Sequence, residues 1–312
     1  MPPPPPRLAA IGECMIELRH RDDWRLDLAF GGDTFNTAVY LARLGRGNGL
    51  TVDYATALGE DPYSAAMRAA FTREGVGLSL VRTVAGRVPG LYAIRTDASG
   101  ERTFFYWRRE AAARAMFDGP EGEALARSLQ GYDWLYFSGI TLSILGDEAR
   151  LTLFAALDAA RARGARVAFD PNYRPHGWSE PAAARAVMSE ALRRSDLALP
   201  TLPDEKSLFG DADAEACVKR LTKLGVREIA VKDSGAPALV HDETHHAHVP
   251  AFSVAKIVDT TAAGDAFNAG YLRARIKGGS PLEAASAGHR LAAAVVGHPG
   301  AIIPASAMPR LD

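Results

Sequence analysis

The segment that decides the fold is residues 134–170, WLYFSGITLSILGDEARLTLFAALDAARARGARVAFD. Its two ends, Trp134–Ser138 and Arg166–Asp170, are short apolar runs of the kind that form buried strands. Between them, Asp147–Arg163 is rich in Ala and Leu, has the length of a helix, and is followed by Gly164, a typical helix-ending residue. A strand, a helix and a second strand in this order indicate a βαβ unit, in which both strands lie parallel in one sheet.

The same alternation extends in both directions along the chain. The sequence therefore predicts an α/β fold with a central, mainly parallel sheet that helices flank. Towards the C-terminus we expect helices at Pro181–Arg194, Ala214–Leu224, Gly264–Ile276 and Pro281–Gly297 and strands at Leu197–Pro200 and Glu228–Lys232. Towards the N-terminus we expect strands at Leu8–Ile11, Met15–Leu18 and Val52–Ala57 and helices at Thr34–Leu44 and Pro62–Glu74.

One region does not follow this alternation. Between Gly86 and Arg109 apolar and polar residues alternate on either side of the turn Asp97–Gly100, which predicts an antiparallel hairpin of Leu91–Thr96 and Arg102–Trp107. A hairpin inserted into an α/β chain is a candidate lid over a substrate. We expect lid strands from about 14–32 and 86–110, a disordered Pro-rich lead-in at 1–7, and one large α/β domain over 8–312.

Composition narrows the possible partners. The 312 residues include 36 Lys and Arg against 37 Asp and Glu, a formal net charge of −1, which argues against nucleic acid or a membrane surface as partner. No apolar run approaches the roughly 18 residues that span a bilayer. Cys14 and Cys217 lie far apart, so neither a disulfide framework nor a zinc site is expected. We expect a cytoplasmic enzyme that acts on small molecules.

Two familiar ligand-binding patterns are missing or weak. No Gly is followed by Lys, which excludes a P-loop. Four histidines cluster near the C-terminal third, and either a metal site or a polar hairpin tip could explain them. Their spacing favours the hairpin tip. They are His241, His245, His246 and His248.

In the stretch Asp259–Phe267, DTTAAGDAF, small residues directly precede a predicted helix. A helix N-terminus exposes free N–H groups and a partial positive charge, so a phosphate could approach the backbone at Ala262, Ala263 and Gly264. Asp265 stands in the first turn. It could simply stabilise the helix, or it could accept a proton from a substrate hydroxyl beside the phosphate.

Three further segments carry polar groups suited to a small ligand. In Phe30–Asn36, Asp33 or Thr34 could cap a helix, or Asp33 and Asn36 could bind the hydroxyls of a polyol that lies against Gly31 and Gly32. Arg108 ends the hairpin, and Arg174 follows a parallel strand, where α/β proteins bind ligands. Each guanidinium could hold a carboxylate or a phosphate, although an isolated Arg is most often a solvated surface residue.

In this order, the segments resemble the ribokinase (PfkB-type) family of carbohydrate kinases over about Leu8–Pro304. Within the family they look closest to the kinases that phosphorylate 2-keto-3-deoxygluconate at the C6 hydroxyl. The resemblance implies a ribokinase-like fold with a small β lid, ATP and Mg²⁺ as cofactors, and a monovalent cation as a further option. The segments are Gly31–Thr34, Phe105–Arg108, Glu110–Ala113, Asn172–Arg174, Thr260–Asp265 and Gly300–Pro304.

The resemblance also assigns roles. Asp265 is implied as the catalytic base, with Ala262, Ala263 and Gly264 as the anion hole. The implied substrate-binding residues are Gly31, Gly32, Asp33, Asn36, Tyr92, Tyr106, Arg108, Arg174 and Asp265, and the implied ATP-binding residues are Asn172, Lys232, Ser234, Gly235, Ala262 and Gly264.

The chain departs from the family pattern at three places. Ala262 replaces the usual first Gly of the anion hole, which requires a negative φ there. The family's magnesium-placing Asn-x-x-Glu falls on Thr201–Asp204, followed by Glu205, and the Gly expected after Lys232 comes one residue late, at Gly235. We therefore expect the metal near Thr201, Asp204 and Glu205 without assigning its ligands.

Four interpretations of the substrate remain open at this stage. Two arginines favour a sugar acid, because a charged hydrogen bond contributes about 1.5–3 kcal/mol, whereas a neutral sugar needs no fixed cation. Arg174 could instead serve the ATP phosphates, which leaves a fructokinase or another neutral-sugar kinase as the alternative. A non-catalytic sugar sensor should lack Asp265, and a nucleoside kinase could use Tyr106 and Trp107. An exposed lid could also pair with the lid of a second subunit.

Overall fold

The computed structural model describes residues 4–47, 49–96 and 102–311. Its larger sheet has nine strands in the order β13-β12-β11-β10-β9-β8-β1-β4-β5, and all neighbours are parallel except the pairs that β12 makes. The strands are β1 (Arg7–Ile11), β4 (Thr51–Leu58), β5 (Val81–Thr83), β8 (Trp134–Ser138), β9 (Arg166–Asp170), β10 (Leu197–Ala198), β11 (Glu228–Val231), β12 (Ala238–His241) and β13 (His246–Val249).

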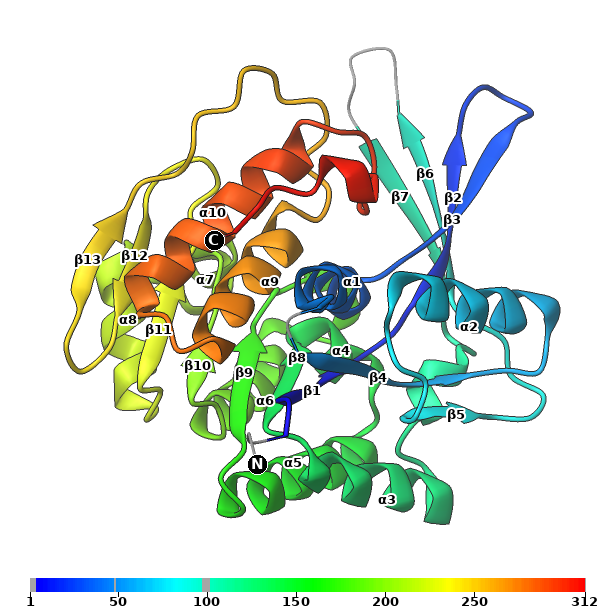
Figure 1. The fold of residues 1–312 in the computed structure, drawn as a ribbon. Coiled ribbons are helices and arrows are strands. Elements are labelled where there is room, and N and C mark those ends of the chain that lie inside the picture. Colours follow the sequence, from blue (N-terminus) through cyan, green and yellow to red (C-terminus); the bar gives the residue numbers. More distant parts are fainter. Residues whose placement is uncertain (1–3, 48, 97–101, 312) are drawn as a thin grey trace.

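Helices cover both faces of this sheet (Figure 1). One face packs on α1 (Asp33–Gly45), α2 (Pro62–Glu74), α9 (Ala263–Ile276) and α10 (Pro281–Val296). The other packs on α3 (Gly119–Ser128), α4 (Gly139–Ile144), α5 (Asp147–Ala162), α6 (Pro181–Arg193), α7 (Leu202–Phe209) and α8 (Ala214–Lys223).

Along each central strand, apolar side chains alternate between the two faces of the sheet and pack against the helix layer on each face. In β1, Leu8 and Ala10 belong to one core cluster and Ala9 and Ile11 to the other, and all four are fully buried. Strands that are buried on both faces have unbroken apolar sequences, so their positions could be predicted well. β8 and β9 have the predicted bounds, and the fold prediction of a parallel sheet flanked by helices is confirmed.

The sequence missed three helices, α3, α4 and α7. Each is ten residues or shorter, and each begins with Gly or has Pro within its first two positions, so its apolar periodicity is too brief to detect. The predicted bounds of α2, β6 and β7 are also exact, and those of the remaining predicted helices and strands differ by one or two residues. Arg7, expected in the lead-in, lies in β1, and its N–H donates to Asp133; residues 1–3 lie outside the described part of the chain.

The smaller sheet is the lid, and it projects away from the helices (Figure 1). It has the order β3-β2-β6-β7, formed by β2 (Met15–His20), β3 (Leu26–Gly31), β6 (Leu91–Thr96) and β7 (Arg102–Trp107). The predicted hairpin of Leu91–Thr96 and Arg102–Trp107 is confirmed, while its turn at Asp97–Gly100 falls outside the described residues. β2 pairs parallel with β6, so the two lid hairpins form one sheet.

The lid register sorts its side chains onto two faces. Tyr92 lies directly opposite Glu17 and Tyr106, so these three share one face. Phe105, opposite Ala93, lies on the other face. Among the described helices, none is long and apolar enough to cross a membrane.

Candidate active site

The N-terminus of α9 forms one wall of the site. Ala262 is its N-cap residue and has φ 61° and ψ 15°, and its carbonyl accepts from the N–H of Ala266 at 2.8 Å. The expectation of a negative φ at Ala262 is therefore wrong. The left-handed conformation costs an alanine roughly 1–2 kcal/mol, and it turns the backbone so that Ala263 and Gly264 open the helix.

Asp265 lies in the first turn of α9 and points into the protein towards α1. Its Oδ2 accepts a hydrogen bond from Nδ2 of Asn36 at 2.8 Å, and its backbone carbonyl accepts from Thr37 at 3.2 Å. Burial raises the pKa of Asp265 to about 8, and the neighbouring Asp33 adds to that rise. A carboxyl with a pKa near neutrality is suited to accept a proton from a hydroxyl.

Asp33 and the two glycines before it approach this carboxyl from the end of β3. Oδ2 of Asp33 accepts from Nδ2 of Asn172 at 2.8 Å. The N-cap of α1 is Gly32, without a side-chain cap bond, so the capping interpretation of Asp33 and Thr34 is wrong. A Cβ on Gly32 would lie 2.1 Å from the backbone oxygen of Glu13, and one on Gly31 would lie 2.6 Å from the Tyr92 hydroxyl. Only glycine fits this crossing between lid and body.

Asn36 keeps one polar atom available. Its Nδ2 bonds Asp265, whereas its buried Oδ1 has no partner among the described residues. An unpaired buried carbonyl oxygen is costly unless a ligand donates to it. The atom therefore supports the predicted role of Asn36 as an acceptor for a sugar hydroxyl.

A buried polar network lies behind the α9 N-terminus. Nζ of Lys232 donates to Asp170 at 2.9 Å and to Asn268 at 2.8 Å, and Asn268 donates to the hydroxyl of Tyr136 at 3.0 Å. A Cβ built on Gly264 would be 3.8 Å from the Lys232 nitrogen. Lys232 therefore places a positive charge directly beneath the predicted anion hole. Ser234, with φ 49°, and Gly235 follow it in the loop that leads to β12.

The lid contributes Tyr92, Tyr106 and Arg108, and two carboxylates hold two of them. The Tyr92 hydroxyl donates to Glu17, and Arg108 forms an ion pair with Glu13, which is fully buried. Burial raises the pKa of Glu13, and Arg108 opposes this rise. Arg108 is thus oriented by Glu13 and is not a free surface cation. Tyr106 is 39% exposed. Burial raises the pKa of its hydroxyl, and the charges of Arg108 and Arg174 oppose this rise.

Arg174 faces the lid from the body of the protein. Its Nη1 donates to the carbonyl of Tyr173 at 2.7 Å and to Asp204 at 3.1 Å. Burial lowers the pKa of Arg174, but the paired Asp204, and more weakly Asp170 and Asp33, raise it above its ordinary value. The guanidinium of Arg174 therefore lies near the carboxylates of Asp204, Asp170 and Asp33.

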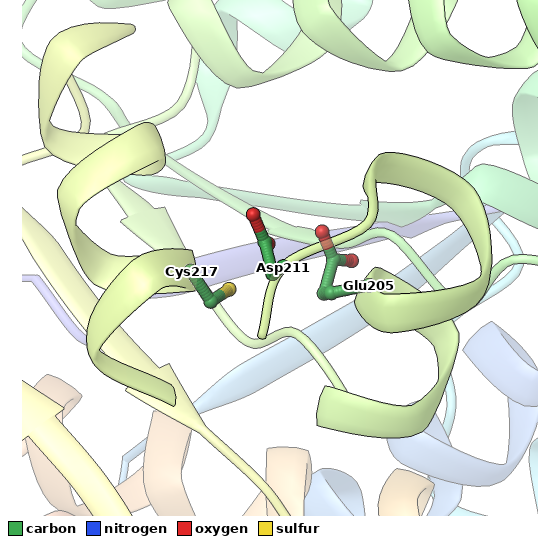
Figure 2. A group of neighbouring side chains, drawn as sticks. All are labelled: Glu205, Asp211 and Cys217. Carbon is green, nitrogen blue, oxygen red and sulfur yellow. The ribbon is translucent and has the colours of Figure 1, made fainter. Parts of the chain in front are cut away.

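The expected metal region divides into two parts. Asp204 stays at the site, where its carboxylate pairs with Arg174, whereas Glu205 turns towards Asp211 and Cys217 (Figure 2). The ligand atoms of these three side chains lie close enough together to hold a metal ion. However, the guanidinium of Arg220 already donates to both carboxylates, at 2.5 and 2.7 Å. An arginine therefore neutralises this cluster, and Asp204 is the one of the two predicted carboxylates that stays at the site, in an ion pair with Arg174.

The sequence did not single out several residues that the structure brings into the site. Glu13 follows β1, Asp170 ends β9 and Tyr136 lies in β8, so the rule that ligands bind beyond the carboxyl ends of parallel strands pointed to two of them. Asn268 stands one helical turn after Gly264 and could have been noticed as a buried polar residue in an apolar helix. The four clustered histidines lie at the β12–β13 hairpin, as predicted.

These features define a class of protein: a ribokinase-like α/β fold with a carboxyl at a helix N-terminus and a β lid facing it. The chain belongs to the pfkB family of carbohydrate kinases, whose profile matches residues 5–308. It is 44% identical to the 2-dehydro-3-deoxygluconokinase of Dickeya dadantii, over 97% of this chain and 98% of that protein. It is 31% identical to the fructokinase of Salmonella typhimurium, over 88% and 85% of the two chains.

A solved structure agrees with this placement. Fructokinase from Xylella fastidiosa with bound ATP has a TM-score of 0.80 and 26% identity, and the match covers 98% of this chain and 95% of that chain. The predicted resemblance to the ribokinase (PfkB-type) family is confirmed.

Substituting Asp265 tests the electrostatics of the site. The pKa of the folded-state carboxyl lies above its ordinary value of 3.8, so between 3.8 and about 8 the folded protein holds a proton that the unfolded chain has lost. Stability therefore falls as pH rises through this window. Asp265→Asn cannot ionise and keeps an acceptor for Asn36, so its Tm should exceed that of the wild type by a few degrees at pH 8 and by less at pH 5.

Differential scanning calorimetry of both proteins from pH 5 to pH 8 measures this difference. Asp118→Asn is the matched control, because Asp118 is exposed and makes no side-chain cap bond. A difference in Tm between Asp265→Asn and the wild type that is the same at both ends of the pH range contradicts the buried-carboxyl explanation.

Proposed function

We propose that this protein transfers the γ-phosphate of ATP to the C6 hydroxyl of 2-keto-3-deoxygluconate, giving 2-keto-3-deoxy-6-phosphogluconate. The observation that carries the proposal is the pair of arginines, Arg108 on the lid and Arg174 on the body, whose charges both act on the hydroxyl of Tyr106. The 44% identical relative named 2-dehydro-3-deoxygluconokinase supports the same substrate.

The two arginines favour an acid over a neutral sugar. Arg108 has one nitrogen committed to Glu13, and Arg174 has one committed to Asp204, so each planar fork retains further donors. A substrate carboxylate between them gains charge-assisted hydrogen bonds worth about 1.5–3 kcal/mol each. Asp33 and the free oxygen of Asn36 then serve the hydroxyls.

The body of the protein supplies the chemistry of transfer. In its ionised form Asp265 accepts the proton of the attacking hydroxyl, and its raised pKa makes this carboxylate a stronger base than an ordinary aspartate. Free N–H groups at the start of α9 and the charge of Lys232 stabilise the transferring phosphoryl group. Asp204 is the carboxylate at the site that would help to hold Mg²⁺, which when bound would neutralise charge on the ATP phosphates.

Two alternatives are weaker for stated reasons. A fructokinase, as the 31% identical relative is named, would leave the remaining donors of Arg108 and Arg174 without a substrate carboxylate to bind. A non-catalytic sensor would have no reason to keep a carboxyl that costs stability, yet half-buried Asp265 has a pKa that desolvation raises to about 8.

A substrate panel tests the proposal. Purified protein is supplied with ATP, Mg²⁺ and K⁺, and ADP release is measured with 2-keto-3-deoxygluconate, fructose and ribose in parallel. We expect kcat/KM for the acid to exceed that for fructose at least tenfold, and Asp265→Asn to lose turnover by orders of magnitude. Fructose turnover equal to or better than that of the acid contradicts the proposal. Withdrawing each cation in turn measures the requirement for it.

Arg108→Lys tests the acid subsite. Lysine preserves the charge opposite the buried Glu13, whereas alanine would leave that carboxylate unpaired and destabilise the lid. Because lysine lacks the planar fork, KM for the acid should rise about tenfold while KM for ATP stays unchanged. The exposed neighbour Arg109→Lys is the control. An unchanged KM for the acid in Arg108→Lys would remove Arg108 from substrate binding.

We further propose that two copies pair through the outer lid face, which is opposite the Tyr92–Tyr106 face. Leu28, Leu18, Ala93 and Phe105 lie in one row across it, and Phe105 and Leu28 are 46% and 49% exposed. A second identical face would cover this apolar row.

Sedimentation velocity at several concentrations should show a dimer that Phe105→Asp converts to monomer, whereas Tyr63→Asp on α2 leaves the sedimentation unchanged. A wild-type protein that is monomeric throughout contradicts lid pairing.

A further inference from the structure

His176 makes an aromatic contact between the body of the protein and the lid. It lies in a single 3₁₀ turn, Pro175–Gly177, which follows Arg174. Its ring stacks on that of Tyr106 in β7, with centroids 5.2 Å apart and an interplanar angle of 26°. Nothing in the sequence distinguishes His176 from an ordinary surface histidine, because its partner is 70 residues away in the chain.

Tyr106 belongs to an aromatic cluster on the lid face that looks towards the body. Its ring stacks with Phe104 at 6.4 Å and 15°, and Tyr92 lies 6.0 Å from Tyr106. His176 extends this cluster from the lid into the body. Stacked aromatic pairs of this kind are worth more than the area they bury, so the contact favours one lid position over others.

The charges around His176 suit a ring that stacks without ionising. Arg108 on the lid and Arg174 on the body both lie close enough to lower the pKa of His176, although burial of the ring has the larger effect. A histidinium there would repel both arginines. The uncharged ring instead fills the space beside them and leaves their donors for a ligand.

We propose that His176 is a positioning residue that holds the lid over the bound sugar acid through its stack on Tyr106. Arg108 comes two residues after Tyr106, directly beyond the end of β7 at Trp107, so fixing the ring of Tyr106 also restrains the short segment that carries the guanidinium of Arg108. The identity of the ligand rests on the proposed function, while the lid contact itself does not.

Two variants separate stacking from other roles. His176→Phe keeps a flat ring and removes the imidazole nitrogens, whereas His176→Ala removes the ring. We expect His176→Ala to raise KM for the sugar acid about 3- to 10-fold, with kcat and KM for ATP within twofold of wild type. His176→Phe should restore KM to within twofold. The half-buried lid histidine His20→Ala is the control, because among the described residues His20 makes no ring contact with Tyr106.

Hydrogen exchange measured by mass spectrometry without ligand gives a second readout that does not depend on activity. Amides of β6 and β7 should exchange faster in His176→Ala than in wild type, and His176→Phe should match wild type. Unchanged lid exchange in His176→Ala overturns the proposal whatever its kinetics, and so does a His176→Phe protein that behaves like His176→Ala.

The two proposals fail in different ways. If the wild type turns over fructose better than the acid, the proposed substrate is wrong, and KM is then measured with the sugar that the wild type prefers. The exchange contrast between His176→Ala and His176→Phe still decides whether His176 positions the lid.

Discussion

The constraint on which the site depends is a concentration of carboxylates at the end of a parallel sheet. Desolvation raises the pKa of Asp265 to about 8, and the nearby carboxylates of Asp33 and Asp170 add to this rise. Such a group is tolerated only if amides and cations surround it. Asn36, Asn172 and Lys232 supply these contacts, and each comes from a different part of the chain. The contacts of these carboxylates therefore connect α1, α9 and the ends of two strands.

The lid is organised by the same principle. Two carboxylates from the start of the chain, Glu13 and Glu17, hold Arg108 and Tyr92. Gly32 allows the chain to cross within contact distance of the Glu13 backbone, so lid and body meet without an intervening side chain. Lid groups that would contact a sugar are thus held in place before a ligand arrives, which reduces the entropy lost on binding.

How far the sequence could be interpreted depended on whether a feature was local. β8 and β9 were placed to the residue because both of their faces are buried and their apolar runs are continuous. The φ of Ala262 was predicted with the wrong sign, because nothing local reveals that the backbone must turn left-handed to open α9. The capping role of Asp33 was excluded because Gly32 is the N-cap of α1, and the Asp33 carboxylate instead pairs with Asn172, 139 residues away.

The sequence by itself determined the α/β class, the lid hairpin, the family and the helix start that carries Asp265, since each rests on short-range periodicity or on a contiguous motif. Only the tertiary structure decided the partners: Glu13 for Arg108, Asp170 and Asn268 for Lys232, Asp204 for Arg174, and His176 for Tyr106. The reason is physical. A polar or charged side chain acquires its orientation and pKa from whatever surrounds it, and those neighbours are assembled by packing elements that lie far apart in the chain.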